Sequence, residues 1–225
     1  RVRGIRRAAM GPAMPNKAGG RTVICDCGAN AECTPEFLLQ FGLVGSLYAK
    51  KYLGVASPKV GLLNIGTEDT KGTPLQKEAY ALLSNAASQG LINFIGNVEG
   101  RGVFDGQCDV LVADGFSGNI LLKSVEGTAM YMMKIMKEAL TANPFSKILA
   151  GMLKPQLRKM KKKLDYTEEG GAVLLGVSKP VVKAHGSSNA KAFKNAIRQA
   201  ANFAKSHAVE QIENEINAKT EAAQA

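Results

Sequence analysis

The stretch HGSSNAK, residues 185–191, has the composition of an anion-binding turn at the start of a helix. A serine can cap the helix that follows, and glycine permits close approach of the backbone. The first N–H groups of a helix attract phosphate. The groups that this stretch offers to a phosphate belong to His185, Gly186, Ser187, Ser188, Asn189 and Lys191. An ordinary helix cap beside a packed histidine explains the stretch equally well.

A second candidate is DGFSGN, residues 114–119, which follows an apolar run and opens a helix. Ser117 is a poor candidate nucleophile, because the spacing is not that of a G-x-S-x-G elbow. The residues with a possible role in binding or positioning an anion are Asp114, Gly115, Gly118 and Asn119. No serine or cysteine has an evident histidine and carboxylate partner, so the pattern favours binding of an anion over a covalent intermediate.

Two further glycine-containing stretches depart from nucleotide-binding motifs. In residues 64–73 the lysine precedes the second glycine, which excludes a Walker A motif. Lys71 can still meet an anionic oxygen, with Asn64 and Gly66 beside it, although a solvated loop with an exposed lysine is the simpler interpretation. Residues 100–106 miss G-x-G-x-x-G by one position, which disfavours a nicotinamide dehydrogenase.

These stretches lie where buried strands are predicted to end. Apolar runs alternate with helical periodicity, which predicts an α/β fold with a mostly parallel sheet and helices on both faces. Parallel sheets place their sites outside the carboxyl ends of the strands. The predicted strands are 22–28, 59–66, 92–100, 108–115 and 179–186, and the predicted helices are 34–54, 73–87, 120–140 and 189–217.

The net charge of +10 is concentrated in two segments. Residues 1–24 hold six Arg and Lys, residues 145–164 hold seven, and neither segment has an acidic residue. The rest of the chain is mildly acidic, which disfavours a general nucleic-acid-binding surface.

The segment 145–164 has an apolar face and a basic face at helical spacing, and Pro155 is predicted to split it into two short helices. We predict a basic amphipathic helical hairpin over residues 143–166. It suits an anionic membrane, an acidic protein or a partner subunit, or it packs on the core with a solvated basic face. Its predicted contact residues are Phe145, Ile148, Leu149, Met152, Leu153, Leu157, Arg158, Lys159, Lys161 and Lys162.

Four cysteines, Cys25, Cys27, Cys33 and Cys108, are predicted to be free and buried in a reduced, cytoplasmic protein. Their spacing matches no common zinc pattern, so neither a metal nor a cofactor is expected. The sequence shows no signal peptide and no apolar run of membrane-spanning length.

The order of the motifs resembles that of bacterial phosphate acyltransferases. The stretches DCGAN, GLLNIG, KGT, NFIGNVEGR, DGFSGN, DYTEEGGAVLLGV and HGSSNAKA carry the resemblance, which extends from about Gly4 to about Ala201. It implies a three-layer α/β/α sandwich similar to phosphotransacetylases and isocitrate/isopropylmalate dehydrogenases. It also implies a homodimer, associated peripherally with the inner face of the membrane, that acts in phospholipid synthesis.

The implied reaction transfers a long-chain acyl group from acyl-acyl-carrier protein to inorganic phosphate. Because phosphate is the nucleophile, no serine or cysteine nucleophile is required. Under this interpretation Lys71, His185 and the amides of residues 186–189 contact phosphate and the oxyanion. The residues expected to position the substrates are Asn30, Asn64, Asp114 and Asn119.

Members of the family carry an N-terminal region with a DAMGGD-type motif, which this sequence lacks. The sequence therefore predicts an N-terminally truncated single domain over residues 1–225. Two other functions stay open: a phosphotransacetylase acting on a short acyl-coenzyme A, and a noncatalytic fragment that binds membrane or carrier protein.

Overall fold

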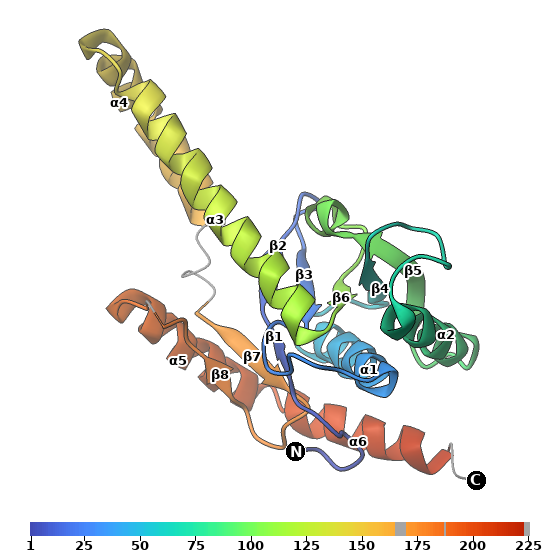
Figure 1. Ribbon diagram of the computed structural model, residues 1–225. Coiled ribbons are helices and arrows are strands. Elements are labelled where there is room, and N and C mark those ends of the chain that lie inside the picture. The colour runs from blue at the N-terminus through green and yellow to red at the C-terminus, as the bar shows by residue number, and fades with distance from the viewer. Residues whose placement is uncertain (165–169, 187, 223–225) are drawn as a thin grey trace.

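A five-stranded sheet lies at the centre of the protein in a computed structural model, which describes residues 1–164, 170–186 and 188–222. The side chains of residues 161–164 and 219–222 are outside this description. The strands are ordered β2-β3-β6-β4-β5 (Figure 1). They comprise β2 (Ala13–Pro15), β3 (Arg21–Cys25), β6 (Val110–Val112), β4 (Lys59–Asn64) and β5 (Asn93–Glu99). Only β2 is antiparallel to its neighbour, which confirms the mostly parallel sheet.

Helices cover both faces of this sheet, because Leu121 and Leu122 of α3 (Gly115–Leu140) pack on the second face beside a short 3-10 helix. Helices α1 (Pro35–Lys51) and α2 (Pro74–Ser88) pack on the first face, where Val110 and Val112 join the larger core. Leu111 belongs to the smaller core on the opposite face, beside the 3-10 helix Gly100–Asp105. The alternation follows from the two-residue period of a strand.

A second sheet is antiparallel and consists of β1 (Ala9–Gly11), β7 (Ala172–Leu175) and β8 (Val182–Lys183). Both β1 and β2 lie within the first twenty residues, where no strand was predicted. Three-residue strands show too little periodicity to be detected in a sequence.

The prediction of one continuous helix over residues 189–217 is wrong. The structure has α5 (Ala190–Lys205) and α6 (Ala208–Ala222), separated by a turn. His207 in this turn has φ of 54°, a left-handed conformation that an α-helix cannot continue. Phe203 of α5 packs edge-on against Tyr48 of α1, and after the break α6 packs on the same helix.

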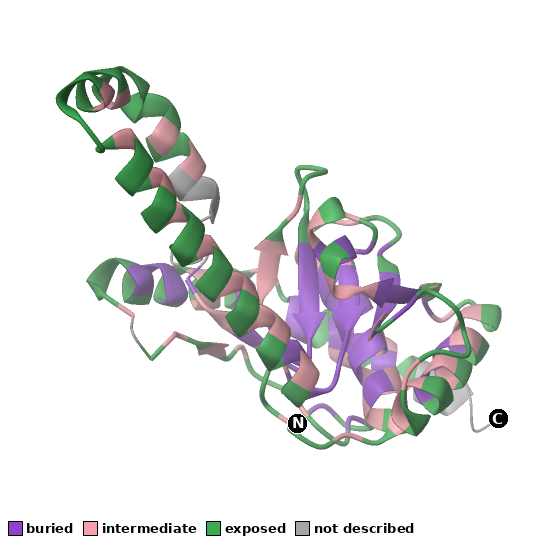
Figure 2. Ribbon diagram, turned by 45° about the horizontal axis from the view of Figure 1, so that its top comes forward, coloured by how far each residue is buried: buried purple, intermediate pink, exposed green. Residues whose placement is uncertain are grey.

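A long helical hairpin projects from the body (Figures 1 and 2). It is formed by α3 (Gly115–Leu140) and α4 (Pro144–Leu164). The predicted division at Pro155 is wrong, because α4 is one helix that includes this proline. Packing along α3 holds α4 together although Pro155 lacks an N–H donor. Residues 165 and 166 of the predicted hairpin lie outside the described part of the chain.

None of the helices in the described part of the chain is long and apolar enough to span a membrane.

Candidate active site

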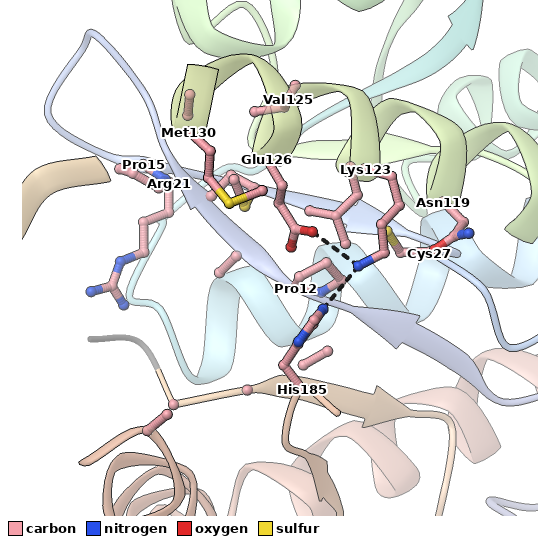
Figure 3. Close-up of a pocket in the computed structure, with 18 of the residues that line it drawn as sticks. Pro12, Pro15, Arg21, Cys27, Asn119, Lys123, Val125, Glu126, Met130 and His185 are labelled. Carbon is pink, nitrogen blue, oxygen red and sulfur yellow. Dashed lines mark hydrogen bonds and ion pairs between the residues drawn. The ribbon is translucent and has the colours of Figure 1, made fainter. Parts of the chain in front are cut away.

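A cavity of about 1720 Å³ lies between α3, the β2–β3 hairpin and the segment that joins β8 to α5 (Figure 3). Its volume exceeds the usual range of about 300–1,000 Å³ for small-molecule pockets. One end of the cavity is polar. The lining residues at this end are Cys27, Gly28, Asn119, Lys123, Glu126, His185, Gly186 and Ser188.

Lys123 is the centre of a charged cluster at the polar end. Its Nζ lies 2.9 Å from Oε2 of Glu126 and 2.9 Å from Nε2 of His185 (Figure 3). An ammonium group only donates hydrogen bonds, so this contact places the lone pair of a neutral imidazole on Nε2. Sequence analysis missed Lys123 and Glu126. The available signal was their spacing, which puts both on the same helical face as Asn119.

The start of α5 contributes polar groups to the same end. Asn189 caps the helix, since its Oδ1 accepts a hydrogen bond of 3.0 Å from the Ala192 N–H. The predicted serine cap is therefore replaced by asparagine. Ser188 Oγ is buried and has no hydrogen-bond partner among the described residues. A buried hydroxyl without a partner in the lining of a cavity is a suitable donor to an anion. Ser187 lies outside the described residues, and Lys191 does not line the cavity.

The glycines of DGFSGN have a packing role. A Cβ atom on Gly118 would lie 2.0 Å from the Asp26 carbonyl oxygen, and one on Gly115 would lie 2.3 Å from that of Asn30. Only glycine allows α3 to approach the loop after β3 so closely. Asp114 caps α3 by accepting a hydrogen bond of 2.8 Å from the Ser117 N–H. Of this motif, only Asn119 lines the cavity among the residues described.

Asp26 organises the loop on which α3 rests. Its buried carboxylate accepts hydrogen bonds from the backbone N–H groups of Met10, Cys27, Ala29 and Asn30. The Asn30 side chain donates to the same carboxylate at 2.9 Å and to the Ala8 carbonyl at 2.8 Å. Asn30 thus joins this loop to the segment before β1 and does not line the cavity. Sequence analysis missed Asp26, whose only signal was an acid within a buried apolar run.

The residues predicted around Lys71 form a separate loop at the end of β4. Asn64 Nδ2 donates to the Lys71 carbonyl at 3.1 Å, and Lys71 Nζ is 4.0 Å from Glu68 Oε1. Neither these residues nor Gly66 line the cavity. Strand β6 separates β4 from β3 in the sheet, although the carboxyl ends of all three face the same edge. The structure therefore brings together Asn119, His185, Gly186 and Ser188 and leaves Lys71 on a neighbouring loop.

Cys27 lines the cavity, but its thiol is not suited to nucleophilic attack. Burial, with a smaller contribution from Asp26, raises its pKa to about 12. The thiol donates to the Gly118 carbonyl at 3.3 Å. All four cysteines are free, and all except the half-buried Cys33 are fully buried. No cluster of three or more potential metal ligands occurs in the residues described.

The predicted contact face of α4 is open to solvent. The exposed apolar side chains are Phe145, Ile148, Leu149, Met152 and Leu153. Leu157 is half-buried, whereas Arg158 and Lys159 are exposed. The side chains of Lys161 and Lys162 lie outside the described set.

Comparisons with known proteins agree on one family. Residues 1–211 match the family described as "Fatty acid synthesis protein". A phosphate acyltransferase of Alkaliphilus oremlandii is 51% identical over 212 residues, which cover 94% of this chain and 62% of the relative. The phosphate acyltransferase of Shouchella clausii is 49% identical, with 89% of this chain and 60% of the relative covered. That of Bacillus subtilis is 44% identical, with 96% and 64% covered. The chain thus spans less than two thirds of the length of these relatives.

Solved structures support the fold. The EutD phosphotransacetylase from Staphylococcus aureus matches with a TM-score of 0.55 at 18% identity, covering 92% of this chain and 55% of that one. A phosphotransacetylase from Streptococcus pyogenes matches with a TM-score of 0.54 at 21% identity, covering 92% and 56%. The fold is therefore that of the phosphotransacetylases, and the sequence shows that this chain belongs to the phosphate acyltransferase family.

Proposed function

We propose that this chain, as part of a longer phosphate acyltransferase, transfers a long-chain acyl group from acyl-acyl-carrier protein to inorganic phosphate. The observation that carries the proposal is the contact of Lys123 with His185 in the lining of a large cavity, which also includes a Ser188 hydroxyl that has no partner in the described part of the chain. Phosphate needs cationic and hydroxyl donors, and the acyl chain needs space. The product, an acyl phosphate, would serve phospholipid synthesis.

The proposed reaction requires no nucleophile from the protein. A phosphate oxygen attacks the thioester carbonyl carbon, the new C–O bond forms, and the C–S bond breaks. The carrier-protein thiolate leaves and takes up a proton from solvent. Lys123, Ser188 and the N–H groups at the start of α5 hold the phosphate, while the Asn119 amide donates to the carbonyl oxygen. Such fixed donors stabilise the charge that develops in the transition state.

The residues outside the cavity take supporting roles in this proposal. Lys71, with Asn64 and Gly66, offers a further cation at the same edge of the sheet. Asp114 and Asn30 hold α3 and its supporting loop in position.

We also propose that the exposed face of α4 contacts the anionic membrane and the acidic carrier protein, and that the whole enzyme is a peripherally bound homodimer. The support is the row of exposed apolar side chains on α4, which lies within the segment 145–164 with its seven basic and no acidic residues. Anionic lipid attracts such a helix and buries its apolar side chains. Flotation of the protein with phosphatidylglycerol vesicles, compared with phosphatidylcholine vesicles, tests the membrane contact.

The activity is tested by trapping acyl phosphate with hydroxylamine. The reaction contains phosphate and either palmitoyl-acyl-carrier protein or acetyl-coenzyme A. Two proteins are compared: this chain, and the chain preceded by the N-terminal region of the Bacillus subtilis relative. Palmitoyl hydroxamate is expected from the longer protein. Product from acetyl-coenzyme A alone would favour a phosphotransacetylase, and vesicle binding without any product would favour a noncatalytic binding fragment.

A further inference from the structure

One face of α3 lines the cavity and changes in character along its length. Asn119 and Lys123 stand at the polar end (Figure 3). Val125, Ala129 and Met133 follow at intervals of four residues, and Lys134 and Lys137 line the far part of the helix. The lining outside α3 includes the apolar Pro12, Met14 and Phe104 together with the basic Lys17 and Arg21.

We infer that this apolar stretch, which we call the α3 groove, holds the acyl chain of the substrate and that Ala129 limits the chain length that fits. The groove is the stretch lined by Val125, Ala129 and Met133 of α3. The inference rests on the proposed function, because the cluster around Lys123 fixes the end at which the reacting carbonyl lies. An unbranched alkyl chain matches an apolar stretch of α3 that lies between Lys123 at one end and Lys134 and Lys137 at the other.

The exposure of apolar side chains along the groove supports an apolar ligand. Met130, beside the groove, leaves 65% of its surface exposed, and Ala129 and Met133 are half-buried. Covering such side chains is favourable by about 0.8 kcal/mol for each buried methylene of a ligand. Methionine is flexible and adapts to irregular apolar surfaces, which suits a chain of many conformers.

The length of the groove fits a long chain. At 1.5 Å per residue, the helix advances about 21 Å from Lys123 to Lys137, the last α3 residue lining the cavity. An extended chain advances about 1.2 Å per bond, since a residue of three bonds spans 3.3–3.6 Å. The path from Lys123 to Lys137, of which the α3 groove is the middle part, therefore accommodates roughly seventeen bonds, close to a palmitoyl chain.

Ala129 lies near the middle of this path. It is six residues beyond Lys123, or about 9 Å, which corresponds to seven or eight bonds. A large side chain at this position fills the groove beyond an octanoyl chain. Ala129→Phe should therefore exclude palmitoyl but not octanoyl groups. Thr128→Phe is the matched control, because Thr128 is exposed on the same helix and does not line the cavity.

The first experiment measures binding of cis-parinaric acid, a fluorescent long-chain fatty acid, to the parent chain and both variants. We expect Ala129→Phe to weaken binding at least tenfold and Thr128→Phe to stay within twofold of the parent. Ala129→Leu, a smaller plug, should give an intermediate loss. Circular dichroism identifies any variant that has lost its fold. Equal binding by folded Ala129→Phe and parent, or equal losses in both phenylalanine variants, would overturn the inference.

The second experiment measures turnover of palmitoyl- and octanoyl-acyl-carrier protein by the active, N-terminally extended protein. Ala129→Phe should lower the ratio of palmitoyl to octanoyl turnover at least tenfold, whereas Thr128→Phe should leave the ratio unchanged. An unchanged ratio in Ala129→Phe would overturn the assignment of Ala129. If no protein forms acyl phosphate, the proposed function fails, and the fatty-acid binding data still decide whether the groove takes an alkyl chain.

Discussion

The Nζ of Lys123 lies 2.9 Å from the Nε2 of His185, which joins the first turns of α3 to the segment before α5. Glu126 holds the same ammonium group from the other side at 2.9 Å. Lys123 is thus held in the lining of a large cavity that also includes Ser188, whose buried hydroxyl has no partner among the described residues. Two segments that are distant in sequence together line the polar end of the cavity.

Replacing Lys123 by methionine should lower kcat for acyl phosphate formation about 100-fold, because removing a single donor aimed at developing charge costs 10²–10³ in rate. Methionine keeps much of the length of the side chain without its charge. Lys77→Met on the exposed surface of α2 is the control and should stay within twofold. Equal activities of the two variants would remove Lys123 from the site.

Lys71→Ala tests the neighbouring loop independently. If Lys71 supplies a second cation to the reacting groups, turnover should decrease more than tenfold while the thermal midpoint stays close to the parent's. The exposed position of Lys71 beside Glu68 implies little stabilisation from this ion pair. Turnover within twofold of the parent would limit the site to the cavity.

Gly118→Ala should destabilise the protein by about 2 kcal/mol or more, since the new Cβ meets a backbone carbonyl that cannot move without shifting the loop. Gly127→Ala in the same helix is the control. Its Cβ has no atom within 4 Å, and alanine should be neutral or stabilising by up to about 1 kcal/mol. Urea unfolding measures the stability of both variants. A Gly118→Ala protein as stable as the parent would contradict the close approach of α3 to the loop after β3.

Asp26→Asn should lower the free energy of unfolding by about 2–3 kcal/mol, because an amide NH₂ group replaces an oxygen that accepts hydrogen bonds from buried donors. Asp105→Asn provides the comparison. Its ion pair with Lys17 is exposed and should contribute less than about 1 kcal/mol. Equal urea midpoints for the two variants would contradict the organising role of Asp26.

Ionisation of the Cys108 thiol should lower the free energy of unfolding at alkaline pH. Burial, with a smaller effect from Asp109, raises its pKa from 9.0 to about 12. The unfolded chain therefore releases this proton first, and the free energy of unfolding decreases as pH rises from about 9 toward 12. Urea midpoints at pH 8 and pH 10.5 should differ less in Cys108→Ala than in the parent. An identical difference in both proteins would show that the thiol does not contribute.

The central strands could be predicted because their signals are local. Continuous apolar runs bounded by glycine predicted β4, β5 and β6, and alternation with helices predicted the parallel sheet. The short strands β1 and β2 and the turn at His207 could not be predicted, since they depend on packing against distant elements. The effect of Pro155 was also predicted incorrectly, since α4 continues through this proline and contacts α3.

The candidate site was predicted in part. His185, Ser188 and Asn119 lie together as their motifs suggested. Lys123 was missed because a lysine on a helix usually faces solvent, and only the fold shows that this one faces His185. Gly115 and Gly118 were predicted to bind substrate, but the residues they approach lie on the loop after another strand, which local spacing cannot reveal.

The most direct test of the proposed reaction uses phosphate labelled with oxygen-18 and palmitoyl-acyl-carrier protein. The N-terminally extended protein is incubated with both, and the product is measured by mass spectrometry. If phosphate attacks the thioester, palmitoyl phosphate should carry the label in every phosphate oxygen, and Lys123→Met should form it about 100-fold more slowly. Release of unlabelled palmitate without palmitoyl phosphate would indicate hydrolysis by water and contradict acyl transfer to phosphate.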